Sequence, residues 1–71
     1  MKNNTKNMTT TTELTEKYLS EHPSIKDCLK KGIINYSKLS RTIAKELNIE
    51  KKTSIEAILI ACRRYEAKIK D

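Results

Sequence analysis

The chain has 71 residues, of which 34% are charged and 4% aromatic, and its 15 basic and 9 acidic side chains give a net charge of +6. A chain of this length forms one domain and buries only about 60% of its unfolded surface, so its core is small. The positive charge permits an anionic partner such as nucleic acid. The three tyrosines, without Trp or Phe, argue against a surface that stacks single-stranded bases.

The start of the chain, MKNNTKNMTTTT, lacks the apolar stretch of a signal peptide. The longest apolar run, AILIAC at residues 57–62, is far shorter than the roughly 20 residues of a membrane span. We therefore expect a cytoplasmic protein without membrane contact. Its two cysteines, Cys28 and Cys62, are expected to be reduced and buried as small apolar side chains. Together with the single His22 they do not make a usual zinc site, so we expect no metal and no cofactor.

Polar residues dominate the first part of the chain, and we expect residues 1–11 to form a disordered tail before a single helical domain at 12–71. Thr10 and Glu13 fit a capping box for a first helix, and Thr12 is a competing cap. The apolar residues of this helix share one side and are Leu14, Tyr18 and Leu19.

Pro23 is predicted to end the first helix, because the residue before a proline is displaced from the helical region. Ser24 and Asp27 repeat the cap pattern for a short second helix, which Gly32 terminates. The apolar residues predicted to be buried in this helix and in the link after it are Ile25, Cys28, Leu29, Ile33 and Ile34.

The segment INYSKLSRTIAKEL predicts a third helix over about residues 36–48, with Asn35 as its cap and Asn48 near its end. Apolar residues recur at i, i+3, i+7, i+8 and i+11, which is one face of a helix. These residues are Tyr36, Leu39, Ile43, Ala44 and Leu47, whereas Lys38, Arg41 and Lys45 lie away from them.

A fourth helix is predicted after a second capping box, TSIE, with Thr53 as the cap, Glu56 reaching back to it and the end near Lys68. Its main apolar stripe contains Ile55, Ile58, Leu59, Cys62, Tyr65 and Ile69, and a second stripe contains Ala57, Ile60 and Ala61. A helix that is apolar on two sides is normally buried on both, so this helix is either central or part of a dimer seam. No strand pattern competes, and the predicted fold is a compact all-α bundle of three to four helices.

The third and fourth helices, joined by a short polar link, are typical of a helix-turn-helix-like unit. In such a unit the second helix enters the major groove of DNA, and lysines and arginines around it contact phosphates. The candidate nucleic-acid-binding residues are Lys38, Arg41, Lys45, Lys51 and Lys52. The fourth helix is a poor reader of bases, because its first turns expose Glu56 and apolar side chains. The alternative interpretation of Lys38, Arg41 and Lys45 is an ordinary solvated helix face.

A protein–protein or homodimer interface is the second candidate function, with Ala57, Ile60, Ala61 and Arg64 as the contact residues. We expect no enzyme, because one histidine cannot be assembled with a nucleophile and an orienting acid into a catalytic site. One glycine also excludes a glycine-rich phosphate loop. No small-molecule substrate is indicated.

The segment HPSIKDCLKKGIINYSKLSRTIAKEL, followed by SIEAILIACRRYEAKI, resembles a group of small, mainly archaeal helical proteins of unassigned function. The shared motifs are His22-Pro23-Ser24, the centre from Gly32 to Ile43, and a helix with the pattern E-A-x-x-x-A-x-R-R-Y at residues 56–65. Longer members of that group join this helical unit to a ligand-sensing domain of the ACT type. The resemblance covers about residues 13–69, with Ser40 in place of the usual alanine, and implies a regulatory, transcription-associated or DNA-binding module.

Overall fold

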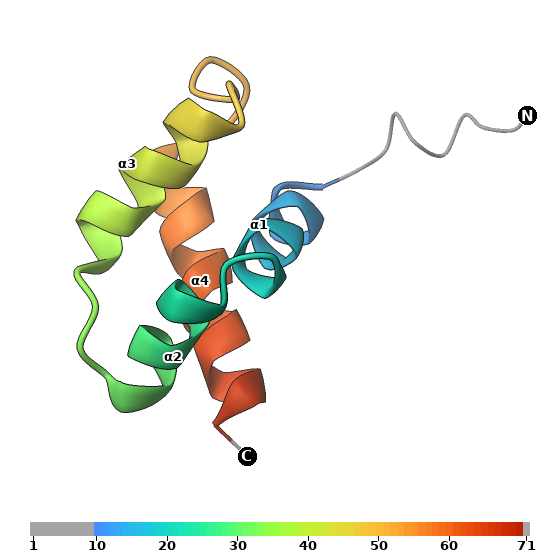
Figure 1. Ribbon diagram of the computed structural model, residues 1–71. Coiled ribbons are helices and arrows are strands. Elements are labelled where there is room, and N and C mark those ends of the chain that lie inside the picture. The colour runs from blue at the N-terminus through green and yellow to red at the C-terminus, as the bar shows by residue number, and fades with distance from the viewer. Residues whose placement is uncertain (1–9, 71) are drawn as a thin grey trace, which may run out of the picture.

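The computed structural model describes residues 10–70, and these residues form four helices and no strand (Figure 1). The predicted all-α fold class is therefore confirmed. The helices are α1 (Thr11–Ser20), α2 (Pro23–Lys31), α3 (Tyr36–Glu46) and α4 (Ile55–Ile69). Most of the tail predicted at residues 1–11 lies outside the described residues. Thr11 already begins α1, so the helical domain starts before residue 12.

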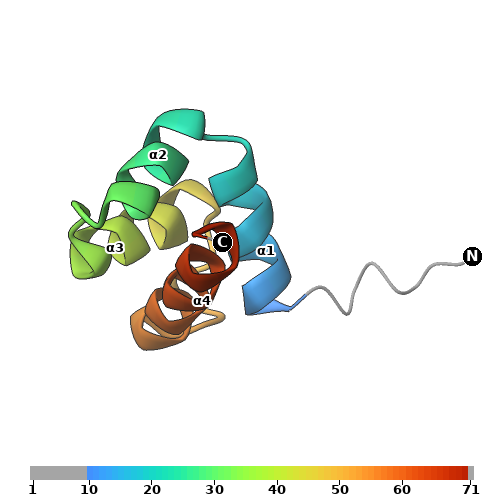
Figure 2. The same cartoon turned by 90° about the horizontal axis from the view of Figure 1, so that it is seen from below.

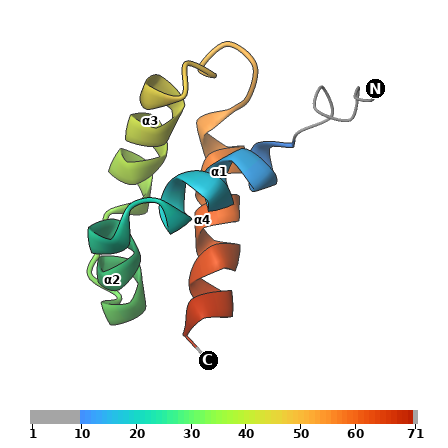
Figure 3. The same cartoon turned by 45° about the vertical axis from the view of Figure 1, so that its right-hand side comes forward.

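The central helix of the bundle is α4, because α1, α2 and α3 each pack against it. In Figure 2, which looks towards the carboxyl end of α4, the other three helices lie above α4 and to either side of it. α3 runs beside α4 in the opposite direction (Figures 1 and 3). In a tight helix-turn-helix the two helices cross steeply after three or four residues. Here residues 47–54 make a longer link, and the two helices pack as an antiparallel pair.

The core forms where the apolar stripes of the four helices meet. Ile43 of α3 and Ile58 of α4 are completely buried, as are Leu19 of α1 and Leu29 of α2. The stripe predicted for α3 and the main stripe predicted for α4 are therefore confirmed. The predicted buried link after α2 is wrong at Ile33, whose side chain is 67% exposed, and Cys28 is only half-buried.

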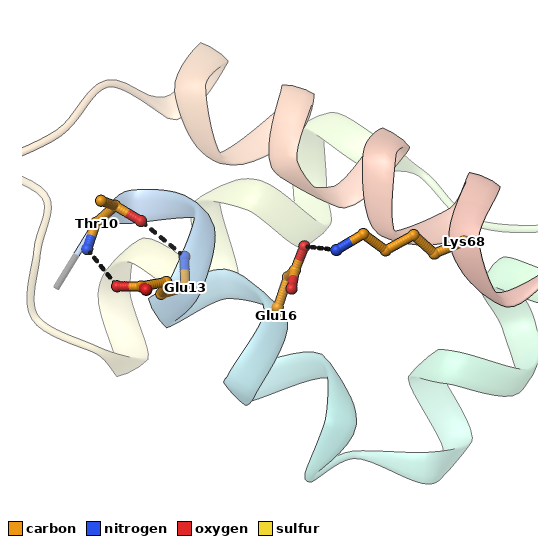
Figure 4. Close-up of polar contacts among 4 residues, drawn as sticks. All are labelled: Thr10, Glu13, Glu16 and Lys68. Carbon is orange, nitrogen blue, oxygen red and sulfur yellow. Dashed lines mark hydrogen bonds and ion pairs between the residues drawn. The ribbon is translucent and has the colours of Figure 1, made fainter.

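Thr10 caps α1 as a capping box predicts, which excludes Thr12 as the cap. The Thr10 hydroxyl accepts a hydrogen bond from the Glu13 amide at 3.1 Å, and the Thr10 amide donates to the Glu13 carboxylate at 3.1 Å (Figure 4). Farther along this helix, the Nζ atom of Lys68 from α4 lies 2.9 Å from the Oε2 atom of Glu16 (Figure 4). The capping box fixes the start of α1, and the exposed Lys68–Glu16 ion pair joins this helix to α4.

The predicted cap of α2 at Ser24 is wrong, because α2 already begins at Pro23, with His22 as its N-cap and no side-chain capping bond. A proline is well suited to the first helical position, where a backbone N–H has no partner within the helix. The His22 ring stacks on the Tyr18 ring at 4.0 Å, and its Nδ1 lies 2.6 Å from the Tyr18 carbonyl oxygen. The corner between α1 and α2 is thus held by His22.

The predicted cap of α4 at Thr53 is also wrong, because the cap is the next residue. The Ser54 hydroxyl accepts a hydrogen bond from the Ala57 amide at 3.0 Å, which starts the helix one residue later. The Thr53 hydroxyl instead lies 2.9 Å from the Thr11 hydroxyl. Thr53 therefore joins the α3–α4 link to the start of α1.

Left-handed residues end α2 and α3 as predicted. Gly32 has a φ of 70° and Asn48 a φ of 58°. After each of them, a backbone amide donates back into the helix: Ile33 to the Cys28 carbonyl at 3.1 Å, and Ile49 to the Ala44 carbonyl at 2.9 Å. This is the Schellman pattern, which satisfies carbonyls that a helix end leaves free.

Replacing Thr15 with valine is expected to stabilise the protein by about 1 kcal/mol, because a buried polar group without a partner costs about 1–3 kcal/mol. Thr15 is completely buried in α1, and its hydroxyl has no hydrogen-bond partner among the described residues. Valine keeps the shape and removes the hydroxyl. Urea denaturation of both proteins measures the difference in free energy of unfolding.

The matched control for this change is Thr42→Val in α3. The Thr42 hydroxyl donates to the Lys38 carbonyl at 3.0 Å and is not buried in the core, so the same substitution should give no stabilisation. A Thr15→Val protein that unfolds at lower urea than the wild type would contradict the prediction.

Candidate nucleic-acid-binding surface

The N-cap of α3 and the packing of its apolar residues determine which side of this helix is exposed. The Asn35 side chain accepts a hydrogen bond from the Lys38 amide at 3.0 Å and so caps the helix. Leu39, Ile43 and Ala44 then face the core, where each is at most 7% exposed. Because an α-helix has 3.6 residues per turn, Lys38, Arg41 and Lys45 lie on the side away from the core, and all three are exposed.

Three basic side chains lie on this outer side, and they are the three that helical spacing predicted to lie away from the apolar face. Lys38, Arg41 and Lys45 are exposed and line one open depression of about 820 Å³, together with Thr42, Glu50 and Ile55. We call Lys38, Arg41 and Lys45 the α3 basic surface. Helical spacing predicted these three residues, but it could not place Glu50, which belongs to the link and not to a helix.

The charges of the α3 basic surface are not neutralised by ion pairs within the described residues. The ion pairs there join Lys31 to Asp27, Lys68 to Glu16 and Lys70 to Glu66. Glu46, the acid next to Lys45 in sequence, accepts a hydrogen bond from the Tyr18 hydroxyl at 2.7 Å and so is directed towards α1. Three basic side chains and Glu50 leave the lining of the depression with a charge of 3 − 1 = +2.

The other two candidate residues, Lys51 and Lys52, lie in the α3–α4 link and are both exposed. The link turns here, with the Lys52 amide donating to the Ile49 carbonyl at 3.0 Å. Lys51 and Lys52 do not line the depression. They follow Glu50 directly in the chain and extend the basic character of this end of the molecule.

A second, smaller hollow of about 260 Å³ adjoins the α3 basic surface, because Lys38 and Thr42 line both. Its other walls are mainly apolar side chains of α2, the α2–α3 link and α3. They include Ile25, Ile34 and Leu39. The sequence did not indicate this hollow, since these residues were predicted to be core.

The residues predicted for a partner interface have different surroundings. Ile60 is 45% exposed and Arg64 is exposed, whereas Ala57 is half-buried. Ala61 is only 1% exposed, so its assignment to an interface was wrong. It is a core residue, because the second apolar stripe of α4 is partly covered by the chain itself.

The second helix of the pair, α4, was expected to be a poor reader of bases and either a central helix or part of a dimer seam. Three other helices pack against α4, and Ile58, Ala61 and Cys62 in its middle are buried. The Cys62 thiol accordingly has its pKa raised to about 11, by burial and against the opposing effect of a hydrogen bond with Ser40. The exposed basic side chains that line a common depression belong to α3.

In residues 10–70, no three histidine, cysteine or acidic side chains come together as ligands for a metal ion. None of the helices in this part of the chain has the length and apolar character needed to cross a membrane.

Comparisons with protein-family models, with curated proteins and with solved structures found no match for this chain.

Proposed function

We propose that the protein binds double-stranded DNA through the α3 basic surface and acts as a small regulatory module. The observation that carries this proposal is the set of three exposed basic side chains on one face of α3, which have no ion-pair partner among the described residues. Lysine and arginine contacts to phosphate supply most of the affinity of such proteins for DNA.

The dimensions of α3 support a duplex as the partner. An α-helix with side chains is about 10–12 Å wide, and the major groove of B-DNA is about 12 Å wide. At 1.5 Å per residue, Lys38, Arg41 and Lys45 are spaced by about 4.5 and 6 Å along the helix axis. α3 also lies at the edge of the molecule (Figures 1 and 2), so a duplex can approach its outer side without meeting another helix.

The competing interpretation is a solvated face that serves only solubility. It gains support from Glu50, whose carboxylate is repelled by phosphate and lines the same depression. The two interpretations differ in their salt dependence. Phosphate contacts release counterions from DNA, which gives a log–log slope of about −0.9 for each contact.

The test is fluorescence anisotropy of a labelled duplex, titrated with the full chain at several salt concentrations. Three contacts from the α3 basic surface predict a slope of about −2.7, and additional contacts from Lys51 and Lys52 would make it steeper. The variant Lys38→Glu/Arg41→Glu/Lys45→Glu should lose binding while keeping the helical circular dichroism of the wild type. Glu50→Gln should bind more tightly, because it removes the one acidic side chain of the depression.

The matched control is Lys17→Glu/Lys30→Glu/Lys31→Glu, which reverses three exposed lysines on α1 and α2. Each reversal changes the charge by two, so both triple variants lower the net charge from +6 to 6 − 6 = 0. The control should keep most of the affinity. Equal losses in the two triple variants, or a wild type whose affinity does not depend on salt, would show that α3 is not a DNA-binding site.

A further inference from the structure

One side of α4 is not covered by another helix of the bundle. In Figure 2 no other helix lies below α4, on the side opposite to α2. Ile60 is 45% exposed in the middle of this helix, and it is one of only two large apolar side chains in residues 10–70 with such exposure. An exposed isoleucine alone is common on protein surfaces and indicates no partner. The charges around Ile60 supply the further evidence.

Glu56 and Arg64 stand at equal distances on either side of Ile60, four residues before it and four residues after it. On a helix these positions share a face with Ile60. Both side chains are exposed, and neither forms an ion pair with another described residue. The neighbouring Arg63 is different, because its guanidinium lies 5.0 Å from the centre of the Tyr36 ring and is therefore held against α3.

This arrangement is complementary to itself in one orientation only. If two copies of α4 meet antiparallel at Ile60, Glu56 of each copy lies level with Arg64 of the other. A parallel pair would place like charges opposite each other, which is unfavourable. A two-fold dimer requires a patch of this kind, in which residue i contacts residue j of the partner and j contacts i.

We propose that the protein forms a two-fold homodimer through an antiparallel pair of α4 helices, centred on Ile60 and held by two Glu56–Arg64 ion pairs. The face of one helix is smaller than the roughly 800 Å² that each partner buries in a standard interface. The dimer is therefore weak and forms reversibly. The inference goes beyond DNA binding, because it uses a different helix and stands if the α3 basic surface has no ligand.

Sedimentation equilibrium of the full chain over a range of concentrations tests the proposal. The wild type should dimerise, and Glu56→Arg and Arg64→Glu should each weaken dimerisation at least about tenfold, since each places like charges opposite each other. The double variant Glu56→Arg/Arg64→Glu restores complementarity at an unchanged net charge, so it should regain most of the wild-type affinity. A gain of this kind is the pairwise coupling that a double-mutant cycle measures.

The control for the apolar centre is a pair of equal substitutions. Ile60→Asp should abolish dimerisation, whereas Ile33→Asp, at the other exposed isoleucine, should leave it unchanged. All variants are made at exposed positions, and circular dichroism verifies that they keep their helices. A wild type that is monomeric at every concentration overturns the proposal. So does a double variant that dimerises no better than the two single variants.

Discussion

Ile58→Ala is expected to lower the free energy of unfolding by about 2–5 kcal/mol, the usual cost of truncating a large buried aliphatic side chain. Ile58 is completely buried in α4 and belongs to the central apolar cluster of all four helices. At about 0.05–0.15 kcal/mol per residue, a domain of this size has only about 3–9 kcal/mol of stability in total. The variant should therefore lose a large part of its stability and unfold at a much lower urea concentration than the wild type. Urea denaturation followed by far-ultraviolet circular dichroism measures the loss.

The same substitution two residues further along α4 is the control. Ile60 is 45% exposed, and alanine is a better helix former than isoleucine, so Ile60→Ala should change the stability by no more than about 0.5 kcal/mol. Both measurements are made at low protein concentration, so that association through Ile60 does not contribute. Equal costs at the two positions would show that α4 is not the centre of the bundle.

These two isoleucines also show how far the sequence determines the fold. The apolar period predicted a main and a second apolar stripe on α4, with both sides buried in the bundle or in a dimer seam. It could not predict that the second side is divided, with Ala61 covered by the chain and Ile60 left exposed. That division depends on where α1 and α3 cross α4, and helix crossing is not encoded in the period of either helix.

The ends of the helices were predicted less accurately than their faces, for a local reason. Before α4, Thr53 and Ser54 are both good caps, and the periodic pattern does not choose between them. The choice follows from a long-range contact, in which the Thr53 hydroxyl is paired with Thr11. Before α2, Pro23 was interpreted as a helix breaker, whereas at a first helical position it is favourable.

Among the residues of the candidate DNA-binding surface, the positions of those in a helix were predicted well and the positions of those in the α3–α4 link were not. Lys38, Arg41 and Lys45 follow helical spacing, so the sequence placed them on one face, and the structure brings them to one depression. Glu50 and Lys51 are in an irregular link, where the spacing of residues does not predict the direction in which their side chains point. Helical spacing also does not show that three helices pack against α4 while the basic side of α3 stays exposed, because this depends on the packing of the whole bundle.

The two proposals can be separated because they concern different helices. The DNA-binding proposal concerns the outer side of α3, while the dimer proposal concerns the outer side of α4. A DNA-binding dimer would give steeper salt dependence than the monomer, since each duplex would then meet two basic surfaces. Measuring DNA affinity for Ile60→Asp therefore shows whether the two surfaces act together.

Tyr18 is expected to make the protein lose stability between about pH 10 and pH 12. The phenol is buried in α1, and its pKa is raised from 10.0 to about 12 by burial first, and then by its hydrogen bond to Glu46 and by the Glu46 charge. Between these two pH values the unfolded chain releases the phenol proton while the native protein keeps it. Release favours the unfolded state, so the stability that is fully present below pH 10 falls as the pH rises towards 12.

The measurement is urea denaturation at a series of pH values for the wild type, Tyr18→Phe and Glu46→Gln. Tyr18→Phe loses the hydrogen bond to Glu46 and should therefore be less stable than the wild type at neutral pH. Because it has no phenol at this position, its free energy of unfolding should decrease less than that of the wild type as the pH rises from about 10 to about 12. Glu46→Gln removes the carboxylate charge and keeps the burial, so its fall should be smaller than that of the wild type and larger than that of Tyr18→Phe. Lysine titration is common to all three proteins and cancels in the comparison. The same alkaline slope in the wild type and in Tyr18→Phe would mean that the phenol of Tyr18 keeps an ordinary pKa and that its contact with Glu46 does not hold α1 to α3 in solution.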